Sequence, residues 1–232
     1  MSGFNTLSIF GEVSRMGDEI AMVTTDENRG AVSEKHWHSR ERCDCLITAA
    51  GLSSRMGAWK LMLPYRQSTI LDESLKNALV LCDRVILVVG HRADELISRY
   101  ANHPRIRLVH NHDYAQGLGS SIRAGLAACS SDHLFVSHGD LPCIPPEVYR
   151  TLWQARGDET LFPSYQGEAG HPVLLPRALV RALAAAPAQG SVRRWLLAHP
   201  HRFIEVQSAA ILQDVDTPER YQALLARGAF ER

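Results

Sequence analysis

An alternation of short apolar runs with helical segments constrains the fold of this chain more than any other feature of its sequence. Residues 84–89 (RVILVV) are β-branched and almost wholly apolar, which is typical of a strand buried on both faces. Similar runs predict strands at 44–49, 106–110 and 133–137. Helical spacing predicts helices at 70–81, 93–100, 118–129 and 145–156. Strands that alternate with helices indicate βαβ units, and therefore a mostly parallel sheet with helices on both faces.

This rhythm loosens after residue 157. Strands are expected at 160–163, 172–175, 203–206 and 211–215, and helices at 177–186, 191–198 and 218–226. Residues 1–42 differ from the rest because they hold long polar stretches and no sustained apolar period. We therefore expect a poorly ordered N-terminal extension over 1–42, followed by one α/β domain over 43–228.

Composition excludes several classes of protein. The 232 residues carry 25 Lys and Arg against 25 Asp and Glu, so the net charge gives no general attraction to nucleic acid or anionic lipid. No apolar run approaches the ~18–20 residues that a membrane helix needs. The five cysteines form no disulfide or zinc pattern, which favours reduced thiols. Since no secretion signal is visible either, we expect a cytoplasmic protein with neither nucleic acid nor membrane as a partner.

The segment after the first expected strand has the composition of a phosphate-binding loop. Gly51 and Gly57 let the backbone turn tightly and bring amide N–H groups toward a ligand. Arg55 and Lys60 add two cations that suit phosphate oxygens. The spacing matches neither a Walker A loop nor a dinucleotide-binding GxGxxG. The segment predicts a triphosphate site, with an ordinary Gly-rich turn bearing surface charges as the alternative.

A carboxylate follows another expected strand. Asp140 lies in the segment 137–142 (SHGDLP), directly after the strand predicted at 133–137. Ligands of open parallel sheets bind at the carboxyl ends of the strands, so Asp140 is expected to face the phosphate loop. Mg²⁺ is usually held by one or two carboxylates together with substrate phosphates, which makes Asp140 a candidate magnesium ligand. The alternative is a turn-forming or capping aspartate ahead of Pro142.

Four ordered motifs resemble those of the MobA-like nucleotidyltransferases. They are the loop 49–60 (AAGLSSRMGAWK), the GDLP of 139–142, the GHPV of 170–173 and the DVDTP of 214–218. The last two, with the YAQGLG of 114–119, are similar to the cytidylyl branch of that family. The resemblance covers roughly residues 43–228 and implies a Rossmann-like three-layer α/β/α fold. The extension 1–42 lies outside the family pattern.

The resemblance implies an activity as well as a fold. That activity is the transfer of CMP from CTP to the terminal phosphate of molybdenum-molybdopterin, with release of pyrophosphate. Mg²⁺ is the implied cofactor, held by Asp140 and Asp216. Xanthine dehydrogenase-like or aldehyde oxidase-like enzymes would use the product and are the implied protein partners. Ala50 stands where the guanylyl branch has a glycine, and its methyl group would narrow the pocket beside the base, which favours a pyrimidine.

The same resemblance implies roles for particular residues. Arg55, Lys60 and Asp140 are the expected catalytic residues. The expected nucleotide-binding residues are Ala49, Ala50, Gly51, Ser53, Arg55, Gly57, Lys60, Gly90, Gly119, Ser120 and Ser121. His171 and Arg193 are expected at the acceptor, and Asp140 and Asp216 at the metal.

Structural roles and other activities stay open at this point. Ser120 and Ser121 would also serve as helix caps, and Asp216 would serve as a cap of the last helix. His171, next to a proline, would also serve as a turn histidine. The same fold acting on GTP, or on a sugar or polyol phosphate acceptor, is one alternative function. Another is a non-catalytic partner that delivers the cofactor to molybdenum hydroxylases.

Overall fold

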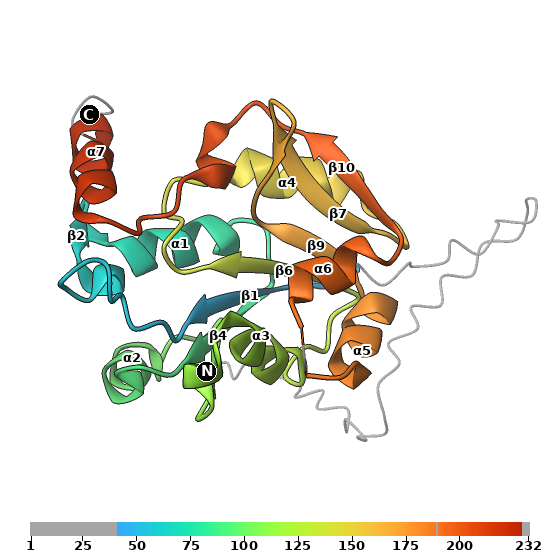
Figure 1. The fold of residues 1–232 in the computed structure, drawn as a ribbon, viewed down its shortest axis with the longest axis horizontal. Coiled ribbons are helices and arrows are strands. Elements are labelled where there is room, and N and C mark those ends of the chain that lie inside the picture. The colour runs from blue at the N-terminus through green and yellow to red at the C-terminus, as the bar shows by residue number, and fades with distance from the viewer. Residues whose placement is uncertain (1–40, 189, 229–232) are drawn as a thin grey trace, which may run out of the picture. The chain divides into compact units, whose positions relative to one another are not determined.

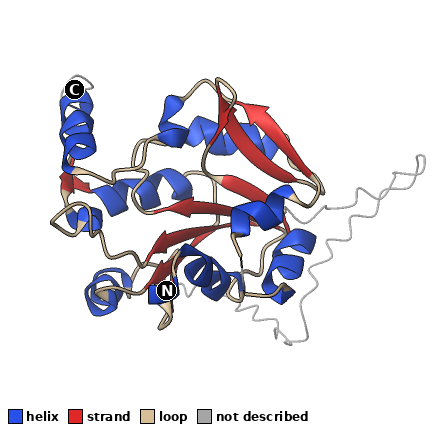
Figure 2. Ribbon diagram, in the orientation of Figure 1, coloured by secondary structure: helices blue, strands red, loops and turns tan. Residues whose placement is uncertain are grey.

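A central mixed sheet organises the protein, whose computed structural model describes residues 41–188 and 190–228 (Figures 1 and 2). The expected extension 1–42 lies outside these residues except for its last two positions. The strand order is β10-β7-β9-β6-β1-β4-β5, and the short strand β8 pairs with β7. The strands are β1 (Cys43–Ala49), β4 (Arg84–Val89), β5 (Ile106–His110), β6 (His133–His138), β7 (Thr160–Tyr165), β8 (Glu168–Ala169), β9 (Val173–Pro176) and β10 (His201–Glu205).

The sheet is mostly parallel, as the sequence predicts. β1 runs parallel to both β4 and β6, β4 runs parallel to β5, and β10 runs parallel to β7. β9 is antiparallel to β6 and β7 and joins these two parallel parts. The four strands at 84–89, 44–49, 106–110 and 133–137 therefore form one parallel unit whose carboxyl ends meet at one edge.

Helices cover both faces of the sheet (Figure 2). One face packs against α1 (Ile70–Leu79), α2 (Ala93–Tyr100) and α4 (Pro146–Gln154). The other packs against α3 (Leu118–Leu126), α5 (Arg177–Ala185) and α6 (Val192–Leu197). The expected three-layer α/β/α architecture is confirmed. None of the helices in the described ranges is long and apolar enough to cross a membrane.

Strand alternation divides the core into two clusters. In β4, Val85, Leu87 and Val89 join the cluster under α1, α2 and α4. Ile86 and Val88 join the cluster under α3, α5 and α6. All five side chains are fully buried, which explains why the strand has no polar face. Burying each such aliphatic side chain stabilises the fold by about 1.5–3 kcal/mol relative to exposure.

The C-terminal helix packs against a small antiparallel ribbon. Strands β2 (Pro64–Tyr65) and β3 (Ser68–Thr69) form an antiparallel pair next to α1. Helix α7 (Pro218–Gly228) packs there through Leu224, and the hydroxyl of Tyr221 donates to the carbonyl of Pro64 at 2.7 Å. The DVDTP segment that precedes α7 is thereby carried across to the edge where the parallel strands end.

One predicted strand is wrong. Residues 211–215 do not pair with the sheet, because the chain forms the 3₁₀ turn η3 (Ala209–Leu212) and then runs irregularly toward α7. Ile211 is buried, and its carbonyl accepts a hydrogen bond from the backbone N–H of His171 at 3.0 Å. The apolar run reflects burial of an irregular segment. The strand expected at 203–206 is present as β10, which begins two residues earlier.

Gly170 fixes how closely this segment approaches the sheet. A Cβ atom at Gly170 would lie 2.2 Å from the carbonyl oxygen of Ile211. Gly170→Ala is therefore expected to lower the free energy of unfolding by about 1–3 kcal/mol, the usual range for overpacking. Urea unfolding measures the change, with Gly157→Ala as control, since a Cβ there meets nothing within 4 Å. Equal unfolding midpoints for the two variants would contradict this account.

Candidate active site

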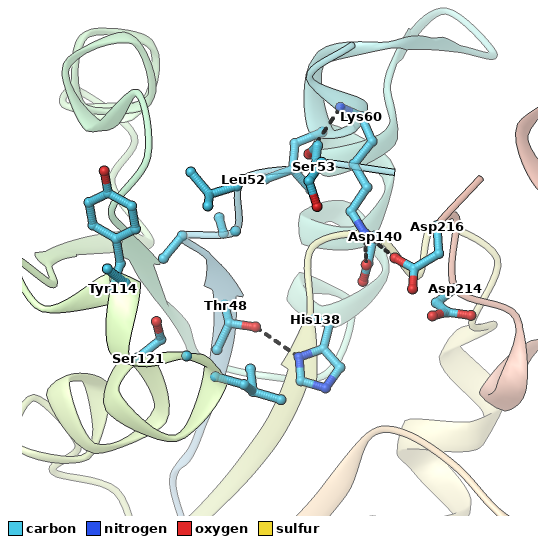
Figure 3. A pocket seen from close by; sticks show the side chains of 18 residues that line it. Thr48, Leu52, Ser53, Lys60, Tyr114, Ser121, His138, Asp140, Asp214 and Asp216 are labelled. Carbon is cyan, nitrogen blue, oxygen red and sulfur yellow. Dashed lines mark hydrogen bonds and ion pairs between the residues drawn. The ribbon is translucent and has the colours of Figure 1, made fainter. Parts of the chain in front are cut away.

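A cleft of about 520 Å³ lies at the carboxyl ends of β1 and β6 (Figure 3). Its lining comes from the segment after β1, the turn before α3, the end of β6 and the segment before α7. The lining residues are Thr48, Ala49, Ala50, Gly51, Leu52, Ser53, Ser54, Lys60, Leu61, Tyr114, Ala115, Gly117, Leu118, Ser121, His138, Asp140, Asp214 and Asp216. The sheet edge expected to bind a ligand is therefore hollowed, and both expected motifs face it.

The loop after β1 turns back on itself and returns Lys60 to the cleft. Ser53 and Gly57 have positive φ angles of 55° and 65°, which reverse the chain direction. The hydroxyl of Ser53 accepts a hydrogen bond from the backbone N–H of Lys60 at 3.4 Å. Met56 is buried against the ribbon side of the molecule and anchors the middle of the loop. The glycine and serine positions of the motif thus shape a loop that places a cation.

Two carboxylates and two cations meet at one side of the cleft. The ammonium of Lys60 donates to Asp140 Oδ2 at 2.5 Å and also to Asp216. The guanidinium of Arg55 contacts the other oxygen of Asp216. The side chain of Lys60 is only 13% exposed, whereas that of Arg55 is 70% exposed. Lys60, Asp140 and Asp216 lie at least 76 positions apart in the sequence, and with Arg55 they are joined into one ionic group.

The ionic group shifts the pKa of Lys60 and that of Asp216. Burial alone would lower the pKa of Lys60, but the carboxylates of Asp140 and Asp216 outweigh it and raise that pKa. Burial alone would raise the pKa of Asp216, but the hydrogen bond and charge of Lys60 outweigh it and lower that pKa. Lys60 and Asp216 therefore form an ion pair that an anionic ligand would compete with.

Asp216 does not cap the last helix. The cap of α7 is Thr217, whose hydroxyl accepts from the backbone N–H of Arg220 at 3.3 Å. Asp216 points into the cleft toward Lys60 (Figure 3). Asp214 is held by an ion pair with Arg220. Asp216 thus belongs to the ionic group rather than to the end of the helix.

The donors at this place fit a divalent cation. Asp140 Oδ1 is buried and has no hydrogen-bond partner among the described residues, although the other oxygen binds Lys60. An unpartnered buried carboxylate oxygen is costly unless a cation or a water satisfies it. No cluster of three or more His, Cys, Asp or Glu side chains forms a metal cage in the described ranges. This donor set suits Mg²⁺, which usually takes one or two carboxylates and completes its shell with phosphates and water.

Several residues expected at the nucleotide do not line the cleft. Gly90 is packed away from it, since a Cβ there would lie 2.6 Å from Tyr114 Cβ and 2.8 Å from Ala50 Cβ. Gly57 shapes the loop without lining the cleft, and Arg55 reaches it only through Asp216. Ser120 is not a lining residue either, because its hydroxyl donates to the backbone carbonyls of 113 and 117.

Six other residues expected at the nucleotide line the cleft. Ala49, Ala50, Gly51, Ser53, Lys60 and Ser121 line the cleft. The hydroxyl of Ser121 accepts from the side-chain amide of Asn111 at 3.0 Å, which ties the first turn of α3 to the end of β5. Helix α3 begins after Gly117, so neither Ser120 nor Ser121 is its N-cap. Gly119 lies in a neighbouring cavity instead of the cleft.

That neighbouring cavity, of about 400 Å³, holds both residues expected at the acceptor. His171 and Arg193 line it together with apolar side chains from β6, β7, β9, α3 and α6. Arg193 lies with its guanidinium carbon 5.9 Å from the ring centre of Phe162. Leu118 and His138 line both the cleft and this cavity, so the two spaces meet at these residues.

His138 is the functional candidate that sequence reasoning missed. It is the last residue of β6 and lines both spaces, and Figure 3 shows its ring beside Thr48 in the cleft. The rule that ligands bind at strand ends selects its segment, 137–142, but a histidine at a strand end is not by itself a signal. Its neighbours Thr48 and His171 come from distant parts of the chain, and only the folded sheet brings them together.

Comparison with known proteins assigns the chain to a family. Residues 45–203 match the MobA-like NTP transferase domain. Molybdenum cofactor cytidylyltransferase of Escherichia coli is 46% identical over 178 residues, which cover 77% of this chain and 93% of that protein. The chain therefore belongs to the MobA-like NTP transferase domain family.

Two further relatives show how broad the likeness is. Nicotine blue oxidoreductase of Paenarthrobacter nicotinovorans is 31% identical over 194 residues, covering 78% of this chain and 95% of that protein. A solved nucleotidyl transferase from Methanothermobacter superposes with a TM-score of 0.72 at 22% identity, covering 82% of this chain and 99% of that one. The likeness to the solved structure supports the fold. The likeness to the oxidoreductase shows that fold and family do not by themselves identify the reaction, which has to be argued from the site.

Proposed function

We propose that this protein transfers CMP from CTP to the terminal phosphate of molybdenum-molybdopterin and releases pyrophosphate. The observation that carries the proposal is the ionic group in the cleft, where Lys60 and Arg55 meet Asp140 and Asp216. Such a group offers cations for a triphosphate and carboxylates for a magnesium ion in one place. The 46% identity to the Escherichia coli cytidylyltransferase supports the choice of nucleotide and acceptor.

The reaction needs no nucleophile from the protein. An oxygen of the acceptor phosphate forms a bond to the α-phosphorus of CTP, and the bond from that phosphorus to the bridging oxygen breaks. Pyrophosphate leaves with the bridging oxygen. The attacking oxygen is already anionic, so the protein contributes positioning and charge neutralisation.

Lys60, at the end of the loop, and Arg55, near its middle, supply that neutralisation. Both would exchange a carboxylate for phosphate oxygens and stabilise the charge that develops on the leaving pyrophosphate. Asp140, with Asp216, would hold Mg²⁺, which when bound supplies further positive charge to the phosphate oxygens. Lys60 is largely shielded from water, and an interaction there is stronger than one at an exposed site.

The wall beside the loop supports a pyrimidine nucleotide. Ala50 lines the cleft and is 5% exposed, with Gly90 and Tyr114 packed behind it. Its methyl group takes up space that a glycine would leave to a larger base. GTP remains the natural competitor to test, because the phosphate-binding groups do not distinguish the bases.

Pyrophosphate release with each nucleotide tests the proposal directly. The protein is incubated with Mg²⁺ and molybdenum-molybdopterin, and CTP, GTP, ATP and UTP are compared. We expect release with CTP that is lost in Asp140→Ala. Preference for GTP would overturn the assignment of the nucleotide, and release with none would contradict the proposed acceptor. A sugar or polyol phosphate acceptor would then be screened.

Arg193 is expected to bind the acceptor phosphate from the neighbouring cavity. A charge-assisted hydrogen bond contributes about 1.5–3 kcal/mol, so Arg193→Ala should raise the KM for the acceptor by roughly 10–100-fold. The KM for CTP should stay unchanged, because Arg193 does not line the cleft. Arg194→Ala is the matched control, since Arg194 is its exposed neighbour on α6 and does not line the cavity. Equal effects of the two variants would contradict the role of Arg193.

Delivery of the product to an enzyme that uses it follows from the same proposal. A labile cofactor benefits from direct transfer, and we expect the product-loaded protein to bind an apo xanthine dehydrogenase-like or aldehyde oxidase-like enzyme. Co-purification of the loaded protein with such an apoenzyme checks this expectation. Binding that is equal with and without product would contradict a delivery role. A cytoplasmic location stays a prediction alongside it.

A further inference from the structure

Three polar side chains form a row across adjacent strands at the carboxyl edge of the sheet. Thr48 of β1 is the register partner of His138 of β6. β6 also pairs with β9, with Val136 opposite Val173, and carrying this antiparallel register two residues further places His138 opposite His171. The hydroxyl oxygen of Thr48 lies 2.8 Å from His138 Nδ1, and His138 Nε2 lies 3.1 Å from His171 Nε2.

The far end of the row fixes the direction of these hydrogen bonds. His171 Nδ1 lies 3.4 Å from the carbonyl oxygen of Val136, which can only accept, so Nδ1 carries the proton. In a neutral His171 the Nε2 atom is then an acceptor, and His138 Nε2–H donates to it. His138 Nδ1 is in turn an acceptor, and the hydroxyl of Thr48 donates to it.

Both rings are held by protein partners at each nitrogen. Burial, followed by His138, lowers the pKa of His171 to about 3. Every ring nitrogen has a protein partner, so neither ring has an N–H or a lone pair left for a phosphate. The expected contact of His171 with the acceptor is therefore a packing contact through its carbon atoms, and polar recognition falls to Arg193.

The row lies where the two substrate spaces meet. His138 lines both the cleft and the neighbouring cavity, and His171 lines the cavity. If CTP occupies the cleft and the acceptor occupies the neighbouring cavity, the α-phosphorus and the attacking oxygen approach each other beside His138. A shift of the ring would change the separation of the two reacting atoms, and a displacement of about 1 Å can cost 10²-fold in rate.

We propose that His138 is a positioning residue whose ring, held between Thr48 and His171, sets how the acceptor meets the nucleotide. This role rests on the proposed function of the two spaces. It assigns no proton transfer to His138. A general acid or base at the same position would need a free nitrogen, which the row does not leave.

The tautomers give a test that needs no turnover. In ¹⁵N-labelled protein at pH 7, long-range ¹H–¹⁵N correlation spectra should show His138 as the Nε2–H form and His171 as the Nδ1–H form. His138→Gln and His171→Gln assign the signals. A proton on His171 Nε2, or His138 without a proton on Nε2, would overturn the row and with it the proposal.

Kinetics test the positioning role with a pair of matched variants. Thr48→Val keeps the shape and the β-branched backbone preference but removes the donor, while Thr48→Ser keeps the hydroxyl. We expect Thr48→Val to lower kcat by about 10-fold or more, within the range that misplacement produces. Thr48→Ser should restore most of the rate. Circular dichroism and thermal unfolding show whether each variant is folded.

Binding separates positioning from substrate affinity. The Kd for CTP, measured without acceptor, should change much less than kcat in Thr48→Val, because the hydroxyl of Thr48 is engaged by His138. A large loss of CTP affinity with unchanged kcat would overturn the proposal and make Thr48 a nucleotide contact. Failure of the wild-type protein to release pyrophosphate would instead contradict the proposed function. The tautomer spectra need no turnover and would still test the hydrogen-bonded row.

Discussion

Replacing Lys60 by methionine is expected to lower kcat/KM for CTP by about 10²–10³-fold, the usual effect of removing one donor of charge stabilisation from an active site. Lys60 is the more buried of the two candidate cations, and its ammonium contacts both Asp140 and Asp216. Methionine keeps much of the length and volume of lysine, so the loop after β1 can stay in place while the charge is lost. Pyrophosphate release at varied CTP concentration measures the change.

Two further variants make the Lys60 result interpretable. Lys60→Arg keeps the charge and should recover part of the rate, although its fork geometry differs from that of an ammonium. Lys76→Met is the matched control, because Lys76 on α1 is 71% exposed and lies outside both spaces. It should leave kcat/KM within about two-fold. Near wild-type kinetics for Lys60→Met, with thermal unfolding unchanged, would show that Lys60 does not act on the phosphates.

The parallel part of the fold was predictable because its signals are local. In 84–89 the run of β-branched residues leaves no polar face, and the structure buries this strand between two helix layers. The segment 211–215 (ILQDV) is also expected to be a strand but belongs to a 3₁₀ turn and an irregular segment. Burial explains the apolar residues of both. Whether a partner strand is available is a long-range property, and the sequence pattern does not contain it.

The ionic site was predictable for a different reason. Lys60 and Asp140 follow strands that were expected to be parallel, so the rule for strand ends was enough to bring them to one edge. Gly90 satisfied the same rule, yet it serves close packing against Ala50 and Tyr114. A glycine at a strand end does not reveal whether it faces a ligand or a neighbouring side chain. His138 needed the register of three strands before its partners were known.

Asp140→Asn is the second substitution for which a large loss is expected, again about 10²–10³-fold in the rate of pyrophosphate release. Asparagine has nearly the shape of aspartate but lacks the charge that balances Lys60 and would attract Mg²⁺. Its amide nitrogen also cannot replace an anionic oxygen as a ligand of a hard cation. The exposed Asp158 offers a matched control, and Asp158→Asn should change the rate by no more than about two-fold.

Metal dependence shows whether Asp140 holds the cation or acts only on Lys60. If Asp140 holds the cation, Asp140→Asn should raise the Mg²⁺ concentration needed for half-maximal rate. It should also weaken Mn²⁺ binding, followed by electron paramagnetic resonance with CTP present and acceptor absent. If Mn²⁺ bound to the variant as tightly as to the wild type, Asp140 would act on Lys60 alone.

The double variant Lys60→Met/Asp140→Asn tests whether the two residues act together or separately, because groups in direct contact couple. A double variant no slower than either single variant would mean that the two residues work as one unit, whereas a rate loss equal to the product of both would assign Lys60 to the phosphates and Asp140 to the metal.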